Sequence, residues 1–260
     1  MKTASFCKCC NSENLIFVGN LDSNKACWDR YGKRVFPSIG KDIPYFSCNN
    51  CGFVFTSYMD NWGVNEFKNN IYNEDYLTKV NPPLPEERDL PHTSQGGYRL
   101  GQQLSFMLDG SQDDIRILDY GAGSEVSNAG MAFKDAGFDY YSYEPYLSLG
   151  AKNLPLGKFD FIFAIEVIEH CHNLNELSAN ISRYISRDGI FYIQTMLHPF
   201  PTPTNILNSW YIAPRDGHIS IFTFNSITAL FRQVEMNVVQ TTFGLIAFKN
   251  LPKFKNKFFI

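Results

Sequence analysis

The segment Ile115–Gly123, which reads IRILDYGAG, constrains the fold of this chain more than any other stretch. An apolar run leads into Asp119, and a short loop with two glycines follows. Apolar residues then recur at helical spacing as far as Gly137. This order predicts a strand, a tight glycine loop and a helix, where bare backbone and the free N–H groups of the helix start can approach a ligand. By itself the pattern also fits an ordinary strand–helix turn.

Composition narrows the classes of partner. The chain has 260 residues, of which 44% are hydrophobic, enough for one large or two small cores. A net charge of −3 argues against nucleic acid and against an anionic membrane surface as partners. No apolar run reaches the length of a membrane span, and no apolar stretch follows the first residues as in a signal peptide. We expect a cytoplasmic protein that acts on a small molecule.

The first sixty residues carry two Cys-x-x-Cys pairs, Cys7 with Cys10 and Cys48 with Cys51. Each pair places two sulfurs on one tight turn, and two such turns can offer four thiolates to one Zn²⁺ ion. Four sulfur ligands leave no open position, so the ion would be structural. The alternative is four buried free thiols. Residues 1–60 are therefore predicted to be a zinc-ribbon domain, with strands at 29–40, 43–48 and 52–59 and a core supplied mainly by the metal.

Residues 61–112 are predicted to be a helical linker and lid. One or two short helices are expected within 62–77, a proline-rich loop at 81–91, and a helix over 97–108 with leucines on one face. A helix that precedes the first strand often covers a nucleotide pocket. Tyr72 and Arg99 are therefore candidates for contact with a cofactor, with ordinary packing as the alternative.

A second strand is predicted over 138–144, and it ends in Glu144. This residue lies 25 positions after Asp119 (144 − 119). A carboxylate at the end of the second strand can accept hydrogen bonds from both hydroxyls of a ribose. The glycine loop and Glu144 together indicate a ribose-bearing cofactor, which leaves NAD, FAD and S-adenosylmethionine (SAM) open.

The next strand, within KFDFIFAIEVIEH at 158–170, narrows the choice. The segments ILDYGAG, YSYEP and FDFIFAIEVIEH, in this order, resemble the class I SAM-dependent methyltransferases that have an EVxEH segment. The resemblance covers roughly residues 95–245. It implies an α/β fold, a Rossmann-like and mostly parallel sheet of seven strands with helices on both faces, in a SAM-binding domain at 113–260 that follows the small N-terminal zinc-binding β domain. It also implies a set of SAM-binding residues: Asp119, Gly121, Ala122, Gly123, Glu144, Pro145, Ala164 and Glu166.

The rest of this domain is predicted in the same terms. A helix is expected over 173–187, ended by Asp188–Gly189, and then a strand over 190–197. A further helix is expected over 224–234, with Asn225 as its N-cap, before an antiparallel closing hairpin. Two features depart from the family pattern. Glu125 stands where a third glycine is usual, next to Ser124 as a possible helix cap, and the stretch between 144 and 159 is short for a third strand.

Methyl transfer from SAM to an alcohol needs a general base, and histidine is the usual one. Two of the five histidines are the leading candidates. His170 ends the EVxEH segment, and His218 lies in a segment that resembles the acceptor side of relatives. Glu169 or Glu166 can orient such a histidine. The alternative for each histidine is an ordinary loop residue.

The resemblance also suggests the acceptor. Methyltransferases of this layout resemble enzymes that methylate sugars or nucleotide sugars, often precursors of bacterial surface polysaccharides. Three aromatic residues near the expected pocket suit stacking on a sugar or base, or else simply pack in loops: Phe200, Trp210 and Tyr211. The alternatives are another small acceptor (nitrogen, carbon or a phosphorus-linked oxygen) and a non-catalytic SAM-binding, zinc-ribbon interaction protein. A NAD-dependent oxidoreductase is disfavoured because EVIEH has no place in it.

Overall fold

The computed structural model describes residues 4–32, 34–80, 95–109, 114–144, 157–252 and 255–258. The chain forms two compact units, and it passes between them several times. The first unit comprises Met1–Pro82, Ile168–Ser178 and Thr195–Gln233, and the second comprises Pro83–Val167, Ala179–Gln194 and Val234–Ile260. The linear division into 1–60, 61–112 and 113–260 stays a prediction.

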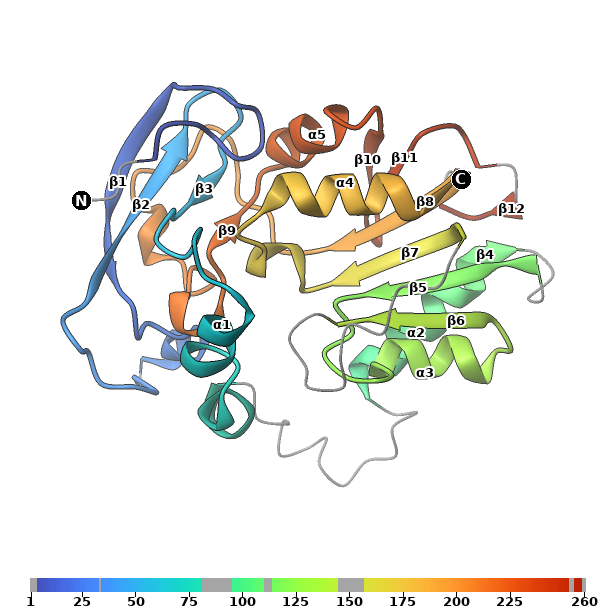
Figure 1. The fold of residues 1–260 in the computed structure, drawn as a ribbon, viewed down its shortest axis with the longest axis horizontal. Coiled ribbons are helices and arrows are strands. Elements are labelled where there is room, and N and C mark those ends of the chain that lie inside the picture. Colours follow the sequence, from blue (N-terminus) through green and yellow to red (C-terminus); the bar gives the residue numbers. More distant parts are fainter. Residues whose placement is uncertain are drawn as a thin grey trace. The chain divides into compact units, whose positions relative to one another are not determined.

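The second unit is built on a six-stranded sheet in the order β10-β11-β8-β7-β5-β6 (Figure 1). Its strands are β5 (Arg116–Tyr120), β6 (Asp139–Tyr143), β7 (Phe159–Ile165), β8 (Ile185–Gln194), β10 (Asn237–Thr241) and β11 (Gly244–Phe248). The four strands from β8 to β6 run parallel, and the hairpin of β10 and β11 is antiparallel. A separate antiparallel pair joins β4 (Leu108–Asp109) to β12 (Lys255–Asn256). The predicted α/β fold with a closing antiparallel hairpin is confirmed.

Apolar side chains are buried on both faces of this sheet. Phe161 and Phe163 of β7 lie in one cluster with Leu104 of α2 (Gly96–Met107) and Phe133 of α3 (Asn128–Asp135). The alternate residues of β7, such as Ile162, are equally buried on the opposite side. A strand that is apolar on both faces is typical of a parallel sheet covered by helices on either side. This explains why the run FIFAI shows no alternation of apolar and polar residues.

Several predicted boundaries were wrong. α4 (Leu174–Tyr184) ends before Asp188–Gly189, and β8 begins at Ile185 rather than at Ile190. Between Ile185 and Ile190 the register against β7 shifts, so the Asp–Gly pair forms a bulge rather than a helix end. Six strands are found among the described residues, where seven were expected. The short stretch in which the missing strand was sought, and the loop at 81–91, lie outside the described residues.

The first unit holds a four-stranded antiparallel sheet in the order β1-β2-β3-β9. Its strands are β1 (Leu15–Asp22), β2 (Asp42–Cys48), β3 (Val54–Phe55) and β9 (Ser220–Ile221). The same unit contains α1 (Val64–Asn70), a π-helix (Tyr76–Val80), α5 (Phe224–Arg232) and four 3-10 helices: Cys27–Tyr31, Ile168–His170, Ile206–Asn208 and Pro214–Asp216. The sequence pattern missed β1, whose residues are all partly buried or exposed and show no regular alternation.

This unit has an apolar core of its own. Phe53 and Phe55 are almost fully buried and stack with ring centroids 5.1 Å apart. Phe222, from a distant part of the chain, packs on Phe53 at 5.0 Å. The expectation that a metal supplies most of this core is therefore wrong. The core depends on a segment after residue 195, which a reading of the first sixty residues alone does not include.

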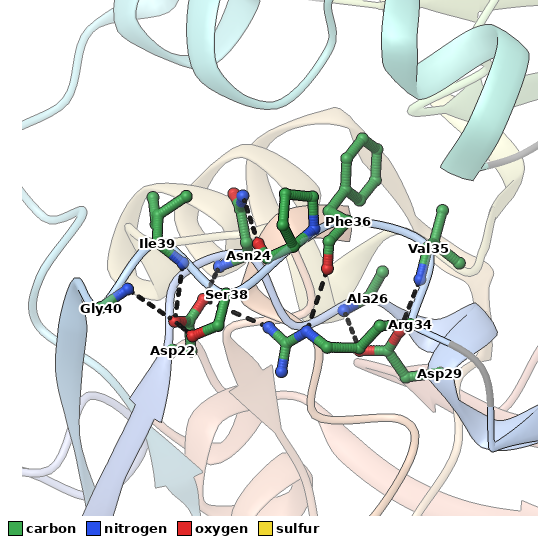
Figure 2. Close-up of polar contacts among 11 residues, drawn as sticks. Asp22, Asn24, Ala26, Asp29, Arg34, Val35, Phe36, Ser38, Ile39 and Gly40 are labelled. Carbon is green, nitrogen blue, oxygen red and sulfur yellow. Dashed lines mark hydrogen bonds and ion pairs between the residues drawn. The ribbon is translucent and has the colours of Figure 1, made fainter.

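In place of the predicted strand at 29–40, residues 29–31 end the 3-10 helix Cys27–Tyr31, and residues 34–40 form a loop held by two carboxylates (Figure 2). Asp22 accepts hydrogen bonds from the backbone N–H groups of Asn24, Ile39 and Gly40, at 2.8, 3.1 and 3.1 Å. Asp29 accepts from the N–H groups of Ala26 and Val35, at 3.2 and 2.9 Å. These carboxylates replace the ladder bonds of a strand, so the loop folds on itself.

The N-cap of α5 is Thr223 and not Asn225. The Thr223 hydroxyl accepts a hydrogen bond from the Ser226 N–H at 3.0 Å, and the Ser226 hydroxyl accepts one from the Thr223 N–H at 3.0 Å. This reciprocal pair is a capping box, which satisfies two backbone donors at once. Among the described residues, no helix is long and apolar enough to cross a membrane.

Replacement of Gly101 by alanine should destabilise the second unit. A Cβ atom there would lie 2.3 Å from the Ala129 carbonyl oxygen, because α2 and α3 cross closely at this point. The clash, at roughly 1–3 kcal/mol, outweighs the gain in helix propensity of about 1 kcal/mol. Urea denaturation should give a lower unfolding free energy for Gly101→Ala. The exposed Gln103→Ala, in the same helix, serves as control and should stay within about 0.5 kcal/mol of the parent.

Candidate functional site

The glycine loop follows β5 directly and takes a left-handed backbone at two residues. Gly121 and Gly123 have φ angles of +82° and +67°. A Cβ atom on Gly121 would lie 2.5 Å from the Val167 side chain, whereas one on Gly123 would meet nothing within 4 Å. The N–H groups of Gly121 and Ala122 donate to the Tyr143 carbonyl at 2.8 and 3.2 Å, which ties the loop to β6. Gly121 is therefore required by packing, and Gly123 borders open space.

Glu144 meets this loop at the end of β6. Its Oε2 atom accepts a hydrogen bond from the Gly123 N–H at 2.9 Å. Because β5 and β6 are parallel neighbours, their carboxyl ends lie at the same edge of the sheet. The structure thus brings together the two elements of the ribose-binding pattern, which lie more than twenty residues apart in the sequence.

Asp119 lies beneath the loop and is 3% exposed. Its Oδ2 atom accepts hydrogen bonds from the Ser127 hydroxyl at 2.5 Å and from the Tyr140 hydroxyl at 2.8 Å. Ser127 also caps α3 by accepting from the Gly130 N–H at 2.9 Å, so Ser124 is not the cap. Burial raises the pKa of Asp119 to about 6, and the nearby Glu144 charge raises it further. The hydrogen bonds from Ser127 and Tyr140 act in the opposite direction and lower this pKa. In these contacts Asp119 holds the loop, the helix start and β6 together.

The other predicted cofactor residues are distributed over both units. Ala164 is fully buried in β7, and Glu166 follows that strand with φ = 53° and donates its N–H to the Gln194 carbonyl at 2.9 Å. Arg99 is exposed on α2. Tyr72 belongs to the first unit, where it contacts His170. Pro145 lies outside the described residues. Their contacts with SAM stay predictions.

The four predicted metal ligands converge in the first unit. The Sγ atoms of Cys7 and Cys51 lie 3.5 Å apart, and those of Cys10 and Cys48 lie 3.6 Å apart. All four sulfurs lie within 4.8 Å of one another. A tetrahedral Zn²⁺ site with Zn–S bonds of about 2.3 Å places its sulfurs about 3.8 Å apart. The cluster therefore has the dimensions of a four-sulfur zinc site.

Neighbouring groups favour the thiolate form of Cys7, whereas burial raises the pKa of Cys10 and the hydrogen bond with Cys7 raises that of Cys51. The Cys9 N–H donates to the Cys7 sulfur at 3.4 Å, and hydrogen bonds from Cys51 and Cys9 lower the pKa of the Cys7 thiol. Lys8 adds a positive charge close to the cluster, where it also donates to the Thr56 carbonyl at 3.0 Å and pairs with Asp60. At Cys7, these are conditions that favour the thiolate, the form in which a sulfur binds a cation.

The three predicted catalytic residues also meet, within the first unit. The ligand atoms of Glu169, His170 and His218 all lie within 4.8 Å of one another, and the two imidazoles pack edge to face with centroids 4.6 Å apart. Burial lowers the pKa of His218 to about 4. Burial and the charge of His218 lower the pKa of His170 well below its usual value. Both imidazoles are therefore neutral at pH 7.

Tyr211 holds this cluster together, a role that the sequence did not reveal. Its hydroxyl donates to Oε1 of Glu169 at 2.6 Å, and its carbonyl lies 3.1 Å from Nδ1 of His218. Tyr211 is 2% exposed, so the predicted stacking of its ring on a sugar or base is wrong. Thr195 supplies a second donor to Glu169, to Oε2 at 3.0 Å. No local pattern marks these residues, because they lie 42 and 26 positions from Glu169.

Comparison with known proteins identifies the family. Residues 92–241 match the family model described as Methyltransferase domain. The match spans more than half of the chain, so the chain belongs to this family. It is a SAM-dependent methyltransferase, in agreement with the sheet, the glycine loop and Glu144 described above.

Three of the solved structures that resemble this chain have a low sequence identity to it. YcgJ from Bacillus subtilis is 15% identical, with 54% of this chain and 68% of YcgJ covered at a TM-score of 0.40. The pyocyanin biosynthetic protein PhzM is 15% identical, with 57% and 52% covered at 0.40. CalO1, a methyltransferase in calicheamicin biosynthesis in its SAH-bound form, is 10% identical, with 60% and 54% covered at 0.42. The chain spans about half the length of the last two. A search of curated proteins gave no match.

The buried Asp119 predicts a stability that falls as pH rises. A pKa of about 6 in the folded chain, against the ordinary 3.8, means that the folded state binds its proton more tightly than the unfolded state does. Its contribution to stability, about 3 kcal/mol, is complete below pH 4 and is lost as pH rises through 6. Relative to Asp119→Asn, the parent should lose this amount in urea unfolding between pH 4 and pH 7. Asp139→Asn, at the start of β6, is the control. If the unfolding free energies of Asp119→Asn and the parent changed with pH in the same way, the assignment would be contradicted.

Proposed function

We propose that this chain transfers the methyl group of SAM to a hydroxyl oxygen of a sugar, a nucleotide sugar or a related precursor of a bacterial surface polysaccharide. The observation that carries the SAM site is the contact between Glu144 and the Gly123 N–H, at 2.9 Å. A carboxylate held at the glycine loop has one oxygen engaged with the backbone and can accept from ribose hydroxyls there. The open space beside Gly123 leaves room for the ligand to approach the backbone.

The reaction is an in-line displacement. The acceptor oxygen forms a bond to the methyl carbon, the carbon–sulfur bond breaks, and its electron pair stays on the sulfur of S-adenosylhomocysteine. The hydroxyl proton must leave, because an alcohol is a weak nucleophile at neutral pH. His170 and His218 are the proposed bases, since their ring nitrogens lie together with the Glu169 carboxylate and both imidazoles are neutral at pH 7. Glu169 is proposed to support the charge that develops on them.

The sugar acceptor has support in the first unit. Arg30 lies over the ring of Trp210 at 4.7 Å and near that of Trp28 at 5.5 Å. Trp210 and Trp28 are only partly buried, and indole faces suit the apolar faces of sugars. A nitrogen, carbon or phosphorus-linked oxygen acceptor is the alternative.

We also propose that Cys7, Cys10, Cys48 and Cys51 hold a structural Zn²⁺ ion. The sulfur distances of 3.5 and 3.6 Å and the positive charge of Lys8 support this assignment. Four sulfur ligands leave the ion no open position for chemistry. Its role would be to join the turn that carries Cys7 and Cys10 to the turn that carries Cys48 and Cys51. The second turn is also held by the Thr223 hydroxyl, which donates to the Cys51 carbonyl at 2.5 Å.

Replacement of Glu144 tests the SAM site. Calorimetry with SAM should show binding to the parent, and Glu144→Gln should weaken it by roughly tenfold or more, because charge-assisted hydrogen bonds are worth about 1.5–3 kcal/mol. Asp139→Asn, which changes a carboxylate at the opposite end of the same strand, should bind as the parent does. Equal affinity of Glu144→Gln and the parent would remove Glu144 from the site.

The acceptor is tested by release of S-adenosylhomocysteine from SAM. A panel should compare nucleotide sugars, free sugars, amines and phosphorylated alcohols, and turnover is expected with a sugar hydroxyl. Turnover confined to amines would favour the alternative acceptor. Absence of turnover with every sugar and nucleotide sugar of the panel would contradict the proposed acceptor.

Zinc removal should destabilise the two turns that carry the cysteine pairs. The purified chain should contain one equivalent of zinc by elemental analysis, and a strong chelator should lower its melting temperature. Cys48→Ser should lose the metal, whereas Cys171→Ser, a cysteine outside the cluster, should keep it. A chain that folds normally with no zinc would contradict the proposal.

A further inference from the structure

General-base catalysis needs one basic side chain, whereas three side chains meet in the cluster of Glu169, His170 and His218. One carboxylate and two imidazoles place their ligand atoms within 4.8 Å of one another, all inside the first unit. Glu169 is fully buried, and His218 is 9% exposed. Two imidazoles and one carboxylate are also the ligand set of many divalent metal sites that keep positions open for a substrate.

The surroundings of each side chain match those of a metal ligand. Both oxygens of Glu169 are oriented by hydroxyl donors, Tyr211 at 2.6 Å and Thr195 at 3.0 Å. Nδ1 of His218 lies 3.1 Å from the Tyr211 carbonyl. A carbonyl only accepts, so this contact assigns the proton to Nδ1 and leaves the Nε2 lone pair for an electrophile.

His170 is oriented in a similar way. Its Nδ1 atom lies 3.2 Å from the Tyr72 hydroxyl. Gly217 allows this approach, because a Cβ atom there would lie 2.8 Å from the same nitrogen. Outer partners that fix the ring and the tautomer are a regular feature of metal-binding histidines and carboxylates. A histidine that only fills a loop does not need them.

We propose that Glu169, His170 and His218 bind a divalent transition-metal ion, such as Mn²⁺, Fe²⁺, Co²⁺ or Zn²⁺. Nitrogen ligands disfavour Mg²⁺ and Ca²⁺, which prefer oxygen. The site differs from the cysteine cluster, because it has no sulfur ligand and its three ligands leave coordination positions open.

The chemical role rests on the function proposed above. An oxygen of the acceptor that binds such an ion has its hydroxyl pKa lowered, so the proton passes to water and the oxygen becomes a nucleophile. The lone pairs of the two imidazoles are then held by the ion. The ion replaces a histidine base as the means of activating the hydroxyl, and it favours acceptors that offer an oxygen donor.

Co²⁺ is the probe that separates the two sites. The full chain, first saturated with zinc at the cysteines, is titrated with CoCl₂ and followed by visible absorption. We expect one further equivalent to bind with the weak d–d bands of nitrogen and oxygen ligands. The intense near-ultraviolet band of cobalt bound to sulfur should be absent. Mn²⁺ binding, measured by electron paramagnetic resonance, should show the same stoichiometry.

Three variants locate the ion. Glu169→Gln and His218→Gln should weaken Co²⁺ binding by at least roughly 100-fold, and Tyr211→Phe, which acts through Glu169 and His218, should weaken it by roughly 10- to 100-fold. His172→Gln, a histidine of the same unit outside the cluster, should bind as the parent does. Circular dichroism checks that each variant is folded, and Tyr211→Phe keeps the test available if Glu169→Gln unfolds.

The outcomes distinguish this inference from the proposed function. No Co²⁺ or Mn²⁺ beyond the cysteine site, or equal binding by Glu169→Gln and the parent, would overturn the metal site. If the chain with zinc at its cysteines then releases S-adenosylhomocysteine without added Co²⁺ or Mn²⁺, the methyltransferase function stands with a histidine base. If the ion binds and the variants weaken it while no hydroxyl acceptor is turned over, the metal site stands and the acceptor proposal fails.

Discussion

The contacts of one buried carboxylate hold the second unit together at the carboxyl ends of its parallel strands. Asp119 ends the apolar part of β5 and binds both Ser127, which caps α3, and Tyr140 of β6. Gly130 is needed for this, since a Cβ atom there would lie 2.2 Å from the Tyr140 hydroxyl. A carboxylate in so apolar a place is costly unless its oxygens are bonded, so strand, loop, helix and neighbouring strand are fixed together. The position of Glu144 beside Gly123 follows from that arrangement.

The first unit depends on a different constraint. The chain comes back to this unit at Thr195, and the segment Thr195–Gln233 completes it. β9 completes its sheet, Phe222 fills its core, and Thr223 joins the cap of α5 to the Cys51 carbonyl. The cysteine cluster is therefore set in a domain that already has an apolar core. His218 reaches Glu169 and His170 by the same return of the chain, so the catalytic and metal-binding proposals both depend on it.

Two independent groups of polar residues thus serve different chemistry. Three of the four cysteines are buried, and the two of each pair are close in sequence, which suits a structural ion. The Glu169 cluster combines a buried carboxylate with two neutral imidazoles, and Tyr211 orients two of the three. Such a cluster can accept a proton or bind an ion. The two roles exclude each other, because both use the lone pairs of His170 and His218.

The sequence alone determined the strands around the glycine loop, the place of Glu144 at the end of the second of these strands, and the two cysteine pairs. Each of these is encoded locally: apolar runs give strands, φ-permissive glycines give the loop, and a spacing of two gives a knuckle. Other features were decided only by the tertiary structure. Thr223 replaced Asn225 as a cap, Asp22 and Asp29 turned a predicted strand into a folded loop, and Tyr211 became a partner of Glu169 rather than a surface ring. The reason is physical: these side chains bond to groups brought close by folding, and no local pattern records which groups those will be.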